Sequence, residues 1–561
     1  MGLTRPSARE ISPRPAMPTN TLTRARIFNP LRCVGMAALL LVSVGCEDPE
    51  PPAPPAVVDA GPPEEPDAAL DAGVVDAGHD AGPPPAPPRL FARRFVSKVR
   101  ERPDREAFRI GYLRAGAVVQ ATTGRPVRAD DPRCRGGWFQ LTTGGYVCNG
   151  RDFIAFWGRR MPQVRGAQPD HAAPLPYEYG RNRRENTPMY RRLPTDEEAV
   201  EFEGYRIPGQ PDPAEEVVGE EGGGAVAGEG TTPEAGEPAT PAPTEPATEA
   251  TEAEEEEPEP VTLANLQGDR DSVLLRRMVN GFIVSLDRDF RAGPHRRRYW
   301  RTINNGFVPY RMLGRVSTPE FMGFRLDDHL YDLPMAFITS RNENTYSRGD
   351  DDRVRRSGRA SFHDRVDIVD TFENGGTTYF EARDGRMYRE QDVRTLRRSP
   401  RPDEVGPTEK WIEVNLSGQY LIAYEGDVPV YATLISSGRP YVAGDPEANY
   451  LTPTGTFRVR AKHLASTMDG DTASDGPYSI DDVPYVMYFE LAYAVHGAFW
   501  HRGFGHPRSH GCVNLAPRDA QWVFNWSEPH VPPGWHGAYP TEDDPGTLIW
   551  IHGETPGIRA R

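Results

Sequence analysis

Two long stretches of low-complexity sequence limit how much of this 561-residue chain can fold. Residues 47–88 carry ten acidic and no basic side chains, and residues 208–260 carry sixteen acidic and no basic ones. Asp-Ala-Gly units recur among the prolines of the first stretch, and the second ends in EAEEEEPEP. Such composition cannot bury enough apolar surface to offset the entropy cost of folding. We therefore expect a disordered tether at 46–90, a disordered acidic linker at 208–260, and folded modules outside them.

The negative charge of the chain is concentrated in these two stretches. The whole sequence has 65 Lys and Arg against 81 Asp and Glu, a net charge of −16. Without the 26 acidic residues of the two stretches, the balance becomes 65 basic against 55 acidic. The foldable remainder is thus near neutral to slightly basic and does not resemble a nucleic-acid-binding protein. Nucleic acid is not an expected partner.

The N-terminus has the features of an export signal. Three arginines between residues 24 and 32 precede the apolar run VGMAALLLVSVG, which ends at Cys46. The run is too short to span a bilayer and has the length of a signal-peptide core. Residues 1–45 are therefore predicted to be a signal peptide, with Met17 as an alternative start.

The end of this run resembles the lipobox of bacterial lipoproteins. Gly45 and Cys46 match the pattern, whereas Ser43 stands where Leu is usual. Small residues at positions 43 and 45 would also suit ordinary signal-peptidase cleavage. We expect lipidation of Cys46, because the Pro-rich tether that follows would give an anchored protein reach from its membrane. The predicted location is the cell envelope or periplasm, with the chain anchored to a membrane.

The remaining cysteines fall into a pair and a single residue. An exported protein permits disulfides, and Cys134 and Cys148 lie close together in one strand-rich segment. We expect them to be bonded; two buried free thiols are the alternative. If Cys33 leaves with the signal and Cys46 is lipidated, Cys512 is the odd cysteine and the one to suspect of reactivity.

The segment 91–165 has the pattern of a small β domain. GYLRAGAVVQATTG and GGWFQLTTGGYVC alternate apolar and polar residues around Gly-rich turns, which predicts short strands. These motifs resemble a bacterial SH3-like domain, in which Trp138 and Tyr146 would either line a ligand groove or fill the core. Residues 166–207 are expected to be an irregular extension, and residues 261–400 a β-rich accessory region.

The alternation of apolar and polar residues is clearest from Lys410 onwards. KWIEVNLSGQYLIAY and VPVYATL alternate on both sides of short turns, which predicts an antiparallel meander. The best helix candidate, PRDAQWVFNW, follows directly on the segment that contains Cys512. We predict a mainly β chain whose C-terminal domain spans 408–555 and contains one short helix.

The stretch HGAFWHRGFGHPRSHGCVNL combines four of the thirteen histidines with Cys512. It contains no Cys-x-x-Cys pair and no His-Glu-x-x-His, so the spacing does not favour a zinc site, and no metal is expected. A cysteine nucleophile needs an imidazole within reach to take its proton. His496 and Cys512 are the expected pair, and glycines beside them would let a substrate approach the backbone. His501 and His506 are expected to be loop or rim residues.

These residues carry a resemblance to a known family. HG…SHGCVN resembles the signature of the bacterial L,D-transpeptidase catalytic-domain family. KWIEVNLSGQYLIAYEGDVPVYATLISSG, TPTGTFRV, DVPYVMYF and PRDAQWVF stand in the order of that family, so that the resemblance covers about residues 410–553. It implies a sandwich- or barrel-like β domain with cysteine acyltransferase activity and no cofactor.

The resemblance also implies a role for each matching position. Cys512 would be the acyl-accepting nucleophile and His496 its base, oriented by the carbonyl of Gly497. Backbone N–H groups of His510, Gly511 and Cys512 would form an oxyanion hole. The remaining implied roles are loop positioning by Ser509 and Asn514 and lining of a substrate groove by Tyr485, Met487 and Trp500, although these last three could equally be core residues.

The implied reaction is acyl transfer on peptidoglycan stem peptides. Cys512 would attack the amide before the terminal D-Ala of a tetrapeptide, and an amine of a neighbouring stem would resolve the thioester into a 3–3 cross-link. With water as acceptor the chain would be an L,D-carboxypeptidase or another hydrolase; a non-catalytic wall-binding lipoprotein is the further alternative. The expected partners are the stem peptides and, through the lipid, a membrane. The sequence gives no indication of oligomeric state.

Overall fold

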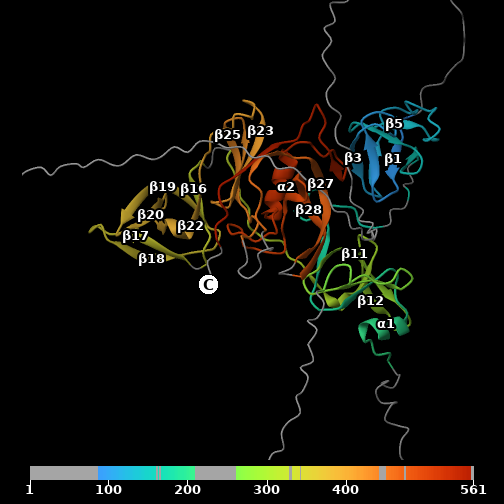
Figure 1. The fold of residues 1–561 in the computed structure, drawn as a ribbon, viewed down its shortest axis with the longest axis horizontal. Helices are drawn as coiled ribbons and strands as arrows, with labels where there is room; N and C mark the ends of the chain where they lie inside the picture. The colour runs from blue at the N-terminus through green and yellow to red at the C-terminus, as the bar shows by residue number, and fades with distance from the viewer. Residues whose placement is uncertain are drawn as a thin grey trace, which may run out of the picture. The chain divides into compact units, whose positions relative to one another are not determined.

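A computed structural model of the chain describes residues 86–158, 162, 166–208, 261–327, 332–341, 343–440, 450–472 and 476–557. The predicted signal peptide at 1–45 lies outside these residues, as do almost all of the tether at 46–90 and of the acidic linker at 208–260. The described residues form a mainly β structure, as predicted (Figure 1). None of their helices has the length and apolar character needed to cross a bilayer.

The first module, residues 86–158, consists of short antiparallel strands. They are β1 (Arg89–Ala92), β2 (Ser97–Arg100), β3 (Arg109–Leu113), β4 (Val118–Gln120), β5 (Trp138–Gln140), β6 (Tyr146–Cys148) and β7 (Phe153–Phe156). β1 lies between β4 and β7, and β3, β2, β6 and β5 follow one another in a second sheet. Leu90, Val99 and Phe139 pack in the shared core. The strands appear where the alternating pattern predicts them, and the SH3-like resemblance stays a prediction.

The cysteines and aromatic residues singled out in this module have different environments. Cys134 and Cys148 form a disulfide with a Cα–Cα distance of 5.7 Å. Trp138 is 2% exposed, and its indole N–H donates a hydrogen bond to Asp131 at 2.7 Å. Tyr146 is half-buried. Trp138 therefore belongs mainly to the core of the module.

The second module corrects the prediction of an irregular extension at 166–207. Its elements are β8 (Glu178–Asn182), β9 (Thr187–Tyr190), α1 (Asp196–Glu203), β10 (Leu274–Met278), β11 (Ile283–Ala292), β12 (Arg297–Thr302), β13 (Phe307–Pro309), a 3-10 turn (Tyr310–Met312) and β14 (Leu313–Arg315). β8 pairs with β11 and β14, and β9 pairs with β10 and β13. Segments before and after the acidic linker thus fold together. The pairing partners lie so far away in sequence that local periodicity does not reveal them.

The third module, residues 335–396, is a separate antiparallel sheet. Its elements are β16 (Met335–Ile338), β17 (Glu343–Arg348), β18 (Val354–Ala360), β19 (Arg365–Asn374), β20 (Thr377–Ala382), β21 (Met387–Arg389), a 3-10 turn (Glu390–Asp392) and β22 (Val393–Leu396). The strand order is β18-β17-β21-β20-β19-β16-β22. Ile338, Val366 and Phe380 belong to its core. The region 261–400 is therefore β-rich, as predicted, but it is divided between two modules.

The C-terminal domain is a sandwich of two sheets with a common core. Its elements are β15 (Phe324–Arg325), β23 (Lys410–Asn415), β24 (Tyr420–Glu425), β25 (Val428–Leu434), β26 (Gly455–Arg458), β27 (Ala461–Thr472), β28 (Gly476–Glu490), β29 (Tyr493–Gly497), β30 (Val513–Leu515), α2 (Pro517–Trp526), β31 (Gly537–Ala538) and β32 (Leu548–His552). One sheet has the order β15-β25-β24-β23-β32-β26. In the other, β31, β27, β28, β29 and β30 follow one another, and pairing of β31 with β3 and of β28 with β11 continues this sheet into the first and second modules. Ile412 and Leu421 pack against Val495 and Val513 across the core.

Helix α2 follows β30 directly and fixes the segment that carries Cys512. Pro517 occupies its first turn, where its missing N–H costs nothing. Buried Asp519 accepts hydrogen bonds from Thr433 and Tyr431 at this end, and buried Lys462 donates to the Ser527 carbonyl at 2.7 Å at the other. An acid near the N-terminus and a cation near the C-terminus both suit the helix dipole. The helix thereby holds β30 against the core.

Candidate active site

The site lies where β29 and β30 run side by side in parallel. The register pairs His496 with Asn514 and Val495 with Val513. Cys512 immediately precedes β30, one position before the residue that pairs with Val495. The parallel pairing thus brings together two residues that lie sixteen positions apart in sequence, one in β29 and the other directly before β30.

His496 is held as a neutral, oriented imidazole. Its side chain is 3% exposed, and its Nδ1 lies 3.2 Å from the carbonyl oxygen of Gly497. When Nδ1–H donates to that carbonyl, Nε2 keeps its lone pair and can accept a proton. Burial lowers the pKa of His496 to about 4, and the Gly497 carbonyl opposes this shift. The ring is therefore uncharged at neutral pH and available as a base.

Cys512 is a partly exposed free thiol beside an apolar cluster. Ile480, Tyr488 and Trp500 belong to this cluster. Burial raises the pKa of the thiol to about 11, well above neutral pH. Since only the thiolate is nucleophilic, the proton has to leave as the sulfur attacks. Thiol and imidazole are thus both neutral at rest, and charge would separate only during reaction.

Ser509 closes the loop that leads into Cys512. Its hydroxyl donates to the Cys512 carbonyl and accepts the Gly511 N–H at 3.1 Å. Gly511 has a φ of 119°, and a Cβ at this position would lie 2.3 Å from the Tyr493 ring. Glycine alone suits both conditions. The Gly511 N–H donates to Ser509 in this structure, and the place of the His510, Gly511 and Cys512 N–H groups in an oxyanion hole stays a prediction.

The segment ISSGR at 435–439 holds the same loop from the other side, and sequence reasoning did not single it out. Ser436 and Asn514 exchange backbone hydrogen bonds at 2.9 and 3.0 Å, and the Ser509 N–H donates to the Ser437 carbonyl at 3.0 Å. A Cβ on Gly438 would lie 1.8 Å from the Tyr450 carbonyl oxygen. The run of small residues is the signal that could have indicated this close approach.

The other three histidines between residues 496 and 515 make contacts that hold the loop before Cys512 in place. His510 Nε2 lies 2.9 Å from the Arg439 guanidinium, and its ring stacks on Tyr478 at a centroid distance of 5.2 Å. The Asn514 side chain lies 3.1 Å from His501 Nε2, so Asn514 positions the loop through both backbone and side chain. His506 Nε2 lies 2.8 Å from the Thr339 carbonyl.

Two of the three residues assigned to a substrate groove lie elsewhere. Tyr485 and Met487 are each 0% exposed and belong to the core between the two sheets. Side chains alternate along β28, so Val486 and Tyr488 face the opposite side, in the apolar cluster with Cys512. Trp500 does lie at the site, with its ring centroid 5.8 Å from that of His496. Tyr488 is therefore a better candidate for the groove than Tyr485.

The described residues contain no group of three or more His, Cys, Asp or Glu side chains placed to hold a metal ion. The chemistry available to the site follows from the Cys512 thiol and the His496 imidazole. A neutral base on one strand and a thiol directly before the adjacent strand, beside apolar side chains, are suited to covalent acyl transfer.

Comparison with known proteins points to the same region. The family model for the L,D-transpeptidase catalytic domain (YkuD) matches residues 409–551. An L,D-transpeptidase of Enterococcus faecium is 24% identical over 26% of this chain and 50% of its own, with a TM-score of 0.20. The NMR structure of a catalytic domain from the same organism is 23% identical over 26% of this chain and 98% of its own, also with a TM-score of 0.20.

A third similar structure is an L,D-transpeptidase of Xylanimonas cellulosilytica, 25% identical over 28% of this chain and 64% of its own, with a TM-score of 0.19. The chain spans about half the length of the first of these structures, at 50%. No curated protein matches the chain. The C-terminal region, residues 409–551, thus matches the L,D-transpeptidase catalytic-domain family, where the sequence resemblance placed it.

Proposed function

We propose that this protein is a peptidoglycan L,D-transpeptidase that forms 3–3 cross-links through a thioester on Cys512. The observation that carries the proposal is the placement of His496 on β29 and of Cys512 directly before the adjacent parallel strand β30, inside the region that matches the catalytic-domain family. The Gly497 carbonyl beside Nδ1 supports the assignment of His496 as base, because it leaves Nε2 available.

The first half-reaction forms the acyl-enzyme. Cys512 Sγ attacks the carbonyl carbon of the amide between the L-centre of the diamino acid and the terminal D-Ala, while its proton passes to His496 Nε2. The C–N bond then breaks, His496 returns the proton to the leaving amine, and D-Ala departs. Because burial favours the neutral form of both side chains, the imidazolium and the oxyanion arise together and stabilise each other.

The second half-reaction transfers the acyl group to an amine of a neighbouring stem. The amine attacks the thioester carbonyl, His496 takes a proton from it, and the C–S bond breaks as the thiol is restored. The apolar side chains around Cys512, including Trp500 and Tyr488, support aminolysis because they reduce the access of water. With water as acceptor the same steps would release a tripeptide.

The proposed setting is the cell envelope. Export by residues 1–45, lipidation at Cys46 and the Pro-rich tether would place the enzyme near an immobile polymer. The first module, with its SH3-like sequence motifs, would then bind the wall, a role that rests on analogy.

The proposal is tested with purified tetrapeptide muropeptides as substrate. We expect loss of D-Ala together with a 3–3 linked dimer, and neither product from Cys512→Ala. Tripeptide without dimer would replace the transpeptidase by a hydrolase. Undiminished product formation by Cys512→Ala would show that the nucleophile is misassigned.

A further inference from the structure

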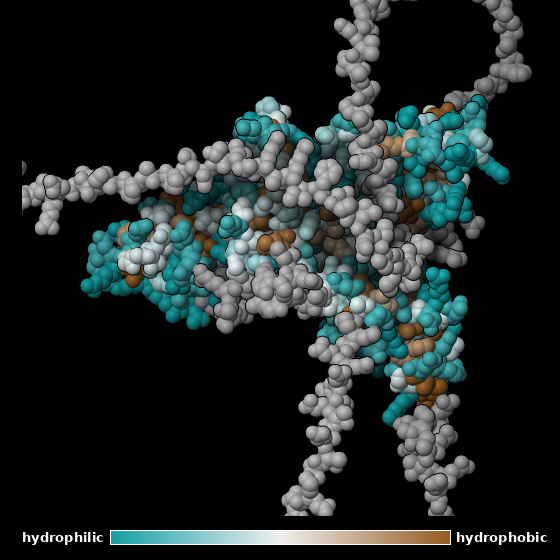
Figure 2. Space-filling model, viewed as in Figure 1, coloured by the Kyte–Doolittle hydropathy of each residue, from teal (hydrophilic) through white to brown (hydrophobic). Residues whose placement is uncertain are grey.

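The first module is strongly basic within an acidic chain. Residues 86–158 contain fourteen Lys and Arg against six Asp and Glu, a net charge of +8, whereas the whole chain carries −16. The face of this module seen in Figure 2 is largely hydrophilic. The part of the chain outside the two acidic stretches is nearly neutral as a whole. Its positive charge is nevertheless concentrated in the first module.

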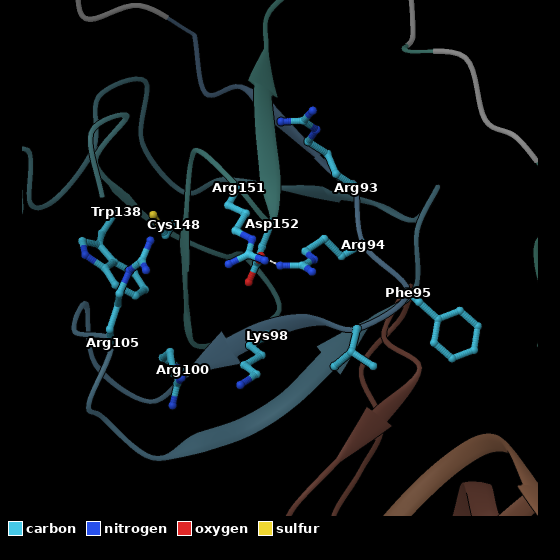
Figure 3. A pocket seen from close by; sticks show the side chains of 11 residues that line it. Arg93, Arg94, Phe95, Lys98, Arg100, Arg105, Trp138, Cys148, Arg151 and Asp152 are labelled. Carbon is cyan, nitrogen blue, oxygen red and sulfur yellow. Dashed lines mark ion pairs between the residues drawn. The ribbon is translucent and has the colours of Figure 1, made fainter. Parts of the chain in front are cut away.

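This charge gathers around one cavity of about 630 Å³. The basic side chains that line it are Arg93, Arg94, Lys98, Arg100, Arg105 and Arg151, and Asp152 is the one acidic residue in the lining (Figure 3). They come from β2 and from the loops that precede β2, β3 and β7. Figure 3 shows Phe95 turned away from these cations.

Most of this positive charge has no carboxylate beside it. Arg94 lies 3.9 Å from Asp152, a long contact between partly exposed groups. Lys98, Arg105 and Arg151 make no ion pair with any residue that the structure describes. Burial and repulsion from Arg109 lower the pKa of Arg100. The cavity thus concentrates cations that the rest of the module does not neutralise.

A disulfide and several hydrogen bonds hold the wall of the cavity, and the guanidinium groups of Arg93 and Arg100 donate to the backbone carbonyls of Gly150 at 3.3 Å and Ala107 at 2.7 Å. Cys148 lines the cavity and is bonded to Cys134, and Trp138 lines it with its indole N–H fixed on Asp131. A firm wall surrounded by long cationic side chains is suited to a ligand with several negative groups. It is poorly suited to an apolar small molecule, because few lining residues offer apolar surface.

We propose that this cavity binds a multivalent oxyanion, namely carboxylate or phosphate groups displayed on a polymer of the cell envelope. Guanidinium groups match both oxyanions through paired hydrogen bonds. Several cations in one cavity attract a ligand with several negative charges more strongly than one cation does. Binding of such a ligand also reduces the repulsion between the cations. This inference rests on the proposed cell-envelope setting, but not on the chemistry assigned to Cys512.

The test uses the full-length protein with two soluble probes, poly-L-glutamate for carboxylates and polyphosphate for phosphates. The cavity variant combines Lys98→Gln, Arg105→Gln and Arg151→Gln. The matched control combines Arg102→Gln, Arg125→Gln and Arg135→Gln, which are equally exposed, remove the same charge and lie outside the cavity. We expect the cavity variant to bind at least one probe about 10-fold more weakly and the control to lose less than about 3-fold.

The two probes separate the sources of the oxyanion. Binding of poly-L-glutamate alone identifies a peptide-borne carboxylate, and binding of polyphosphate alone identifies a phosphorylated glycan or lipid. Equal losses in the two variants, or no binding of either probe, would overturn the proposal. So would binding that appears only after deletion of residues 208–260, because the occupant would then be the acidic segment of the chain itself. Turnover of free tetrapeptide by the cavity variant should stay unchanged, which keeps this test separate from that of the transpeptidase.

Discussion

The candidate active site and the basic cavity of the first module differ in how their surroundings affect charge. His496 and Cys512 lie where burial favours the uncharged form of each, so that the pKa of the histidine falls to about 4 and that of the thiol rises to about 11. Lys98, Arg105 and Arg151 instead keep their charges exposed to solvent. Neutral groups at the candidate active site should respond little to salt, whereas salt screens the exposed charges of the cavity.

The largest effect expected from this difference concerns the base. His496→Ala should lower kcat/KM for tetrapeptide by about 10²- to 10⁴-fold, because the neutral thiol loses the group that removes its proton. His530→Ala is the matched control, since this histidine is exposed and lies outside the site. Equal activity of the two variants in a muropeptide assay would contradict the role of His496.

The next effect concerns the geometry of the cysteine loop. Gly511→Ala should reduce turnover by about 10²-fold, because the new Cβ meets the Tyr493 ring at 2.3 Å in a backbone region that disfavours alanine. Gly144→Ala has a similar left-handed backbone, with a φ of 93°, but nothing within 4 Å of its Cβ. It should keep wild-type turnover; a comparable loss there would mean that stability, and not loop geometry, explains the result.

Salt concentration should affect polyanion binding at the basic cavity and turnover at the candidate active site to different extents. Raising the salt concentration from 0.05 to 0.5 M is expected to weaken polyanion binding at the basic cavity about 10-fold or more, because exposed charges are screened. Turnover of a free tetrapeptide should change less than about 2-fold, since the catalytic pair is neutral at rest. Fluorescence titration of the probe and a parallel product assay measure both. Equal sensitivity to salt would break the distinction.

A smaller effect is expected on stability as the pH falls. Burial lowers the pKa of several histidines below the ordinary 6.5, to about 4 for His363, His463 and His496 and to about 3 for His501, and it also holds the pKa of His536 well below its ordinary value. The unfolded chain therefore takes up protons below pH 6.5 that the folded chain does not, and stability present above this pH is lost towards pH 4.

Three carboxyl groups act in the opposite direction, and burial raises the pKa of one of them, Glu203, above its ordinary value. Burial raises the pKa of Asp481 to about 7 and that of Asp519 to about 6, so that the folded chain gains protons, and stability, in the same window. The histidines outnumber them, and each unmatched one contributes up to about 1.4 kcal/mol per pH unit. Urea midpoints at pH 7, 5.5 and 4.5 should therefore fall; a constant or rising midpoint would contradict the burial of these rings.

The sequence predicts those strands and helices whose apolar pattern is contained in the element itself. It does not predict features that depend on residues far apart in the chain. The strands around Ile412 and Leu421 and the helix at 517–526 have periodic patterns of their own, and the structure contains them. The strands at 178–190 were missed because their partners lie beyond the acidic linker. The family resemblance offered Tyr485 as a groove residue with a core position as the alternative, and the sequence does not show which face of β28 meets Cys512; the structure places Tyr485 in the core. The basic cavity was missed because its residues, from Arg93 to Arg151, are scattered along the module.

The most direct test of the central claim is the mass of the protein after brief exposure to a stem tetrapeptide without an acceptor amine. We predict a covalent adduct equal to the tetrapeptide minus D-Ala, located on Cys512 by peptide mapping, released by hydroxylamine and absent from Cys512→Ala. Turnover without any adduct, or an adduct that persists in Cys512→Ala, would contradict the thioester mechanism.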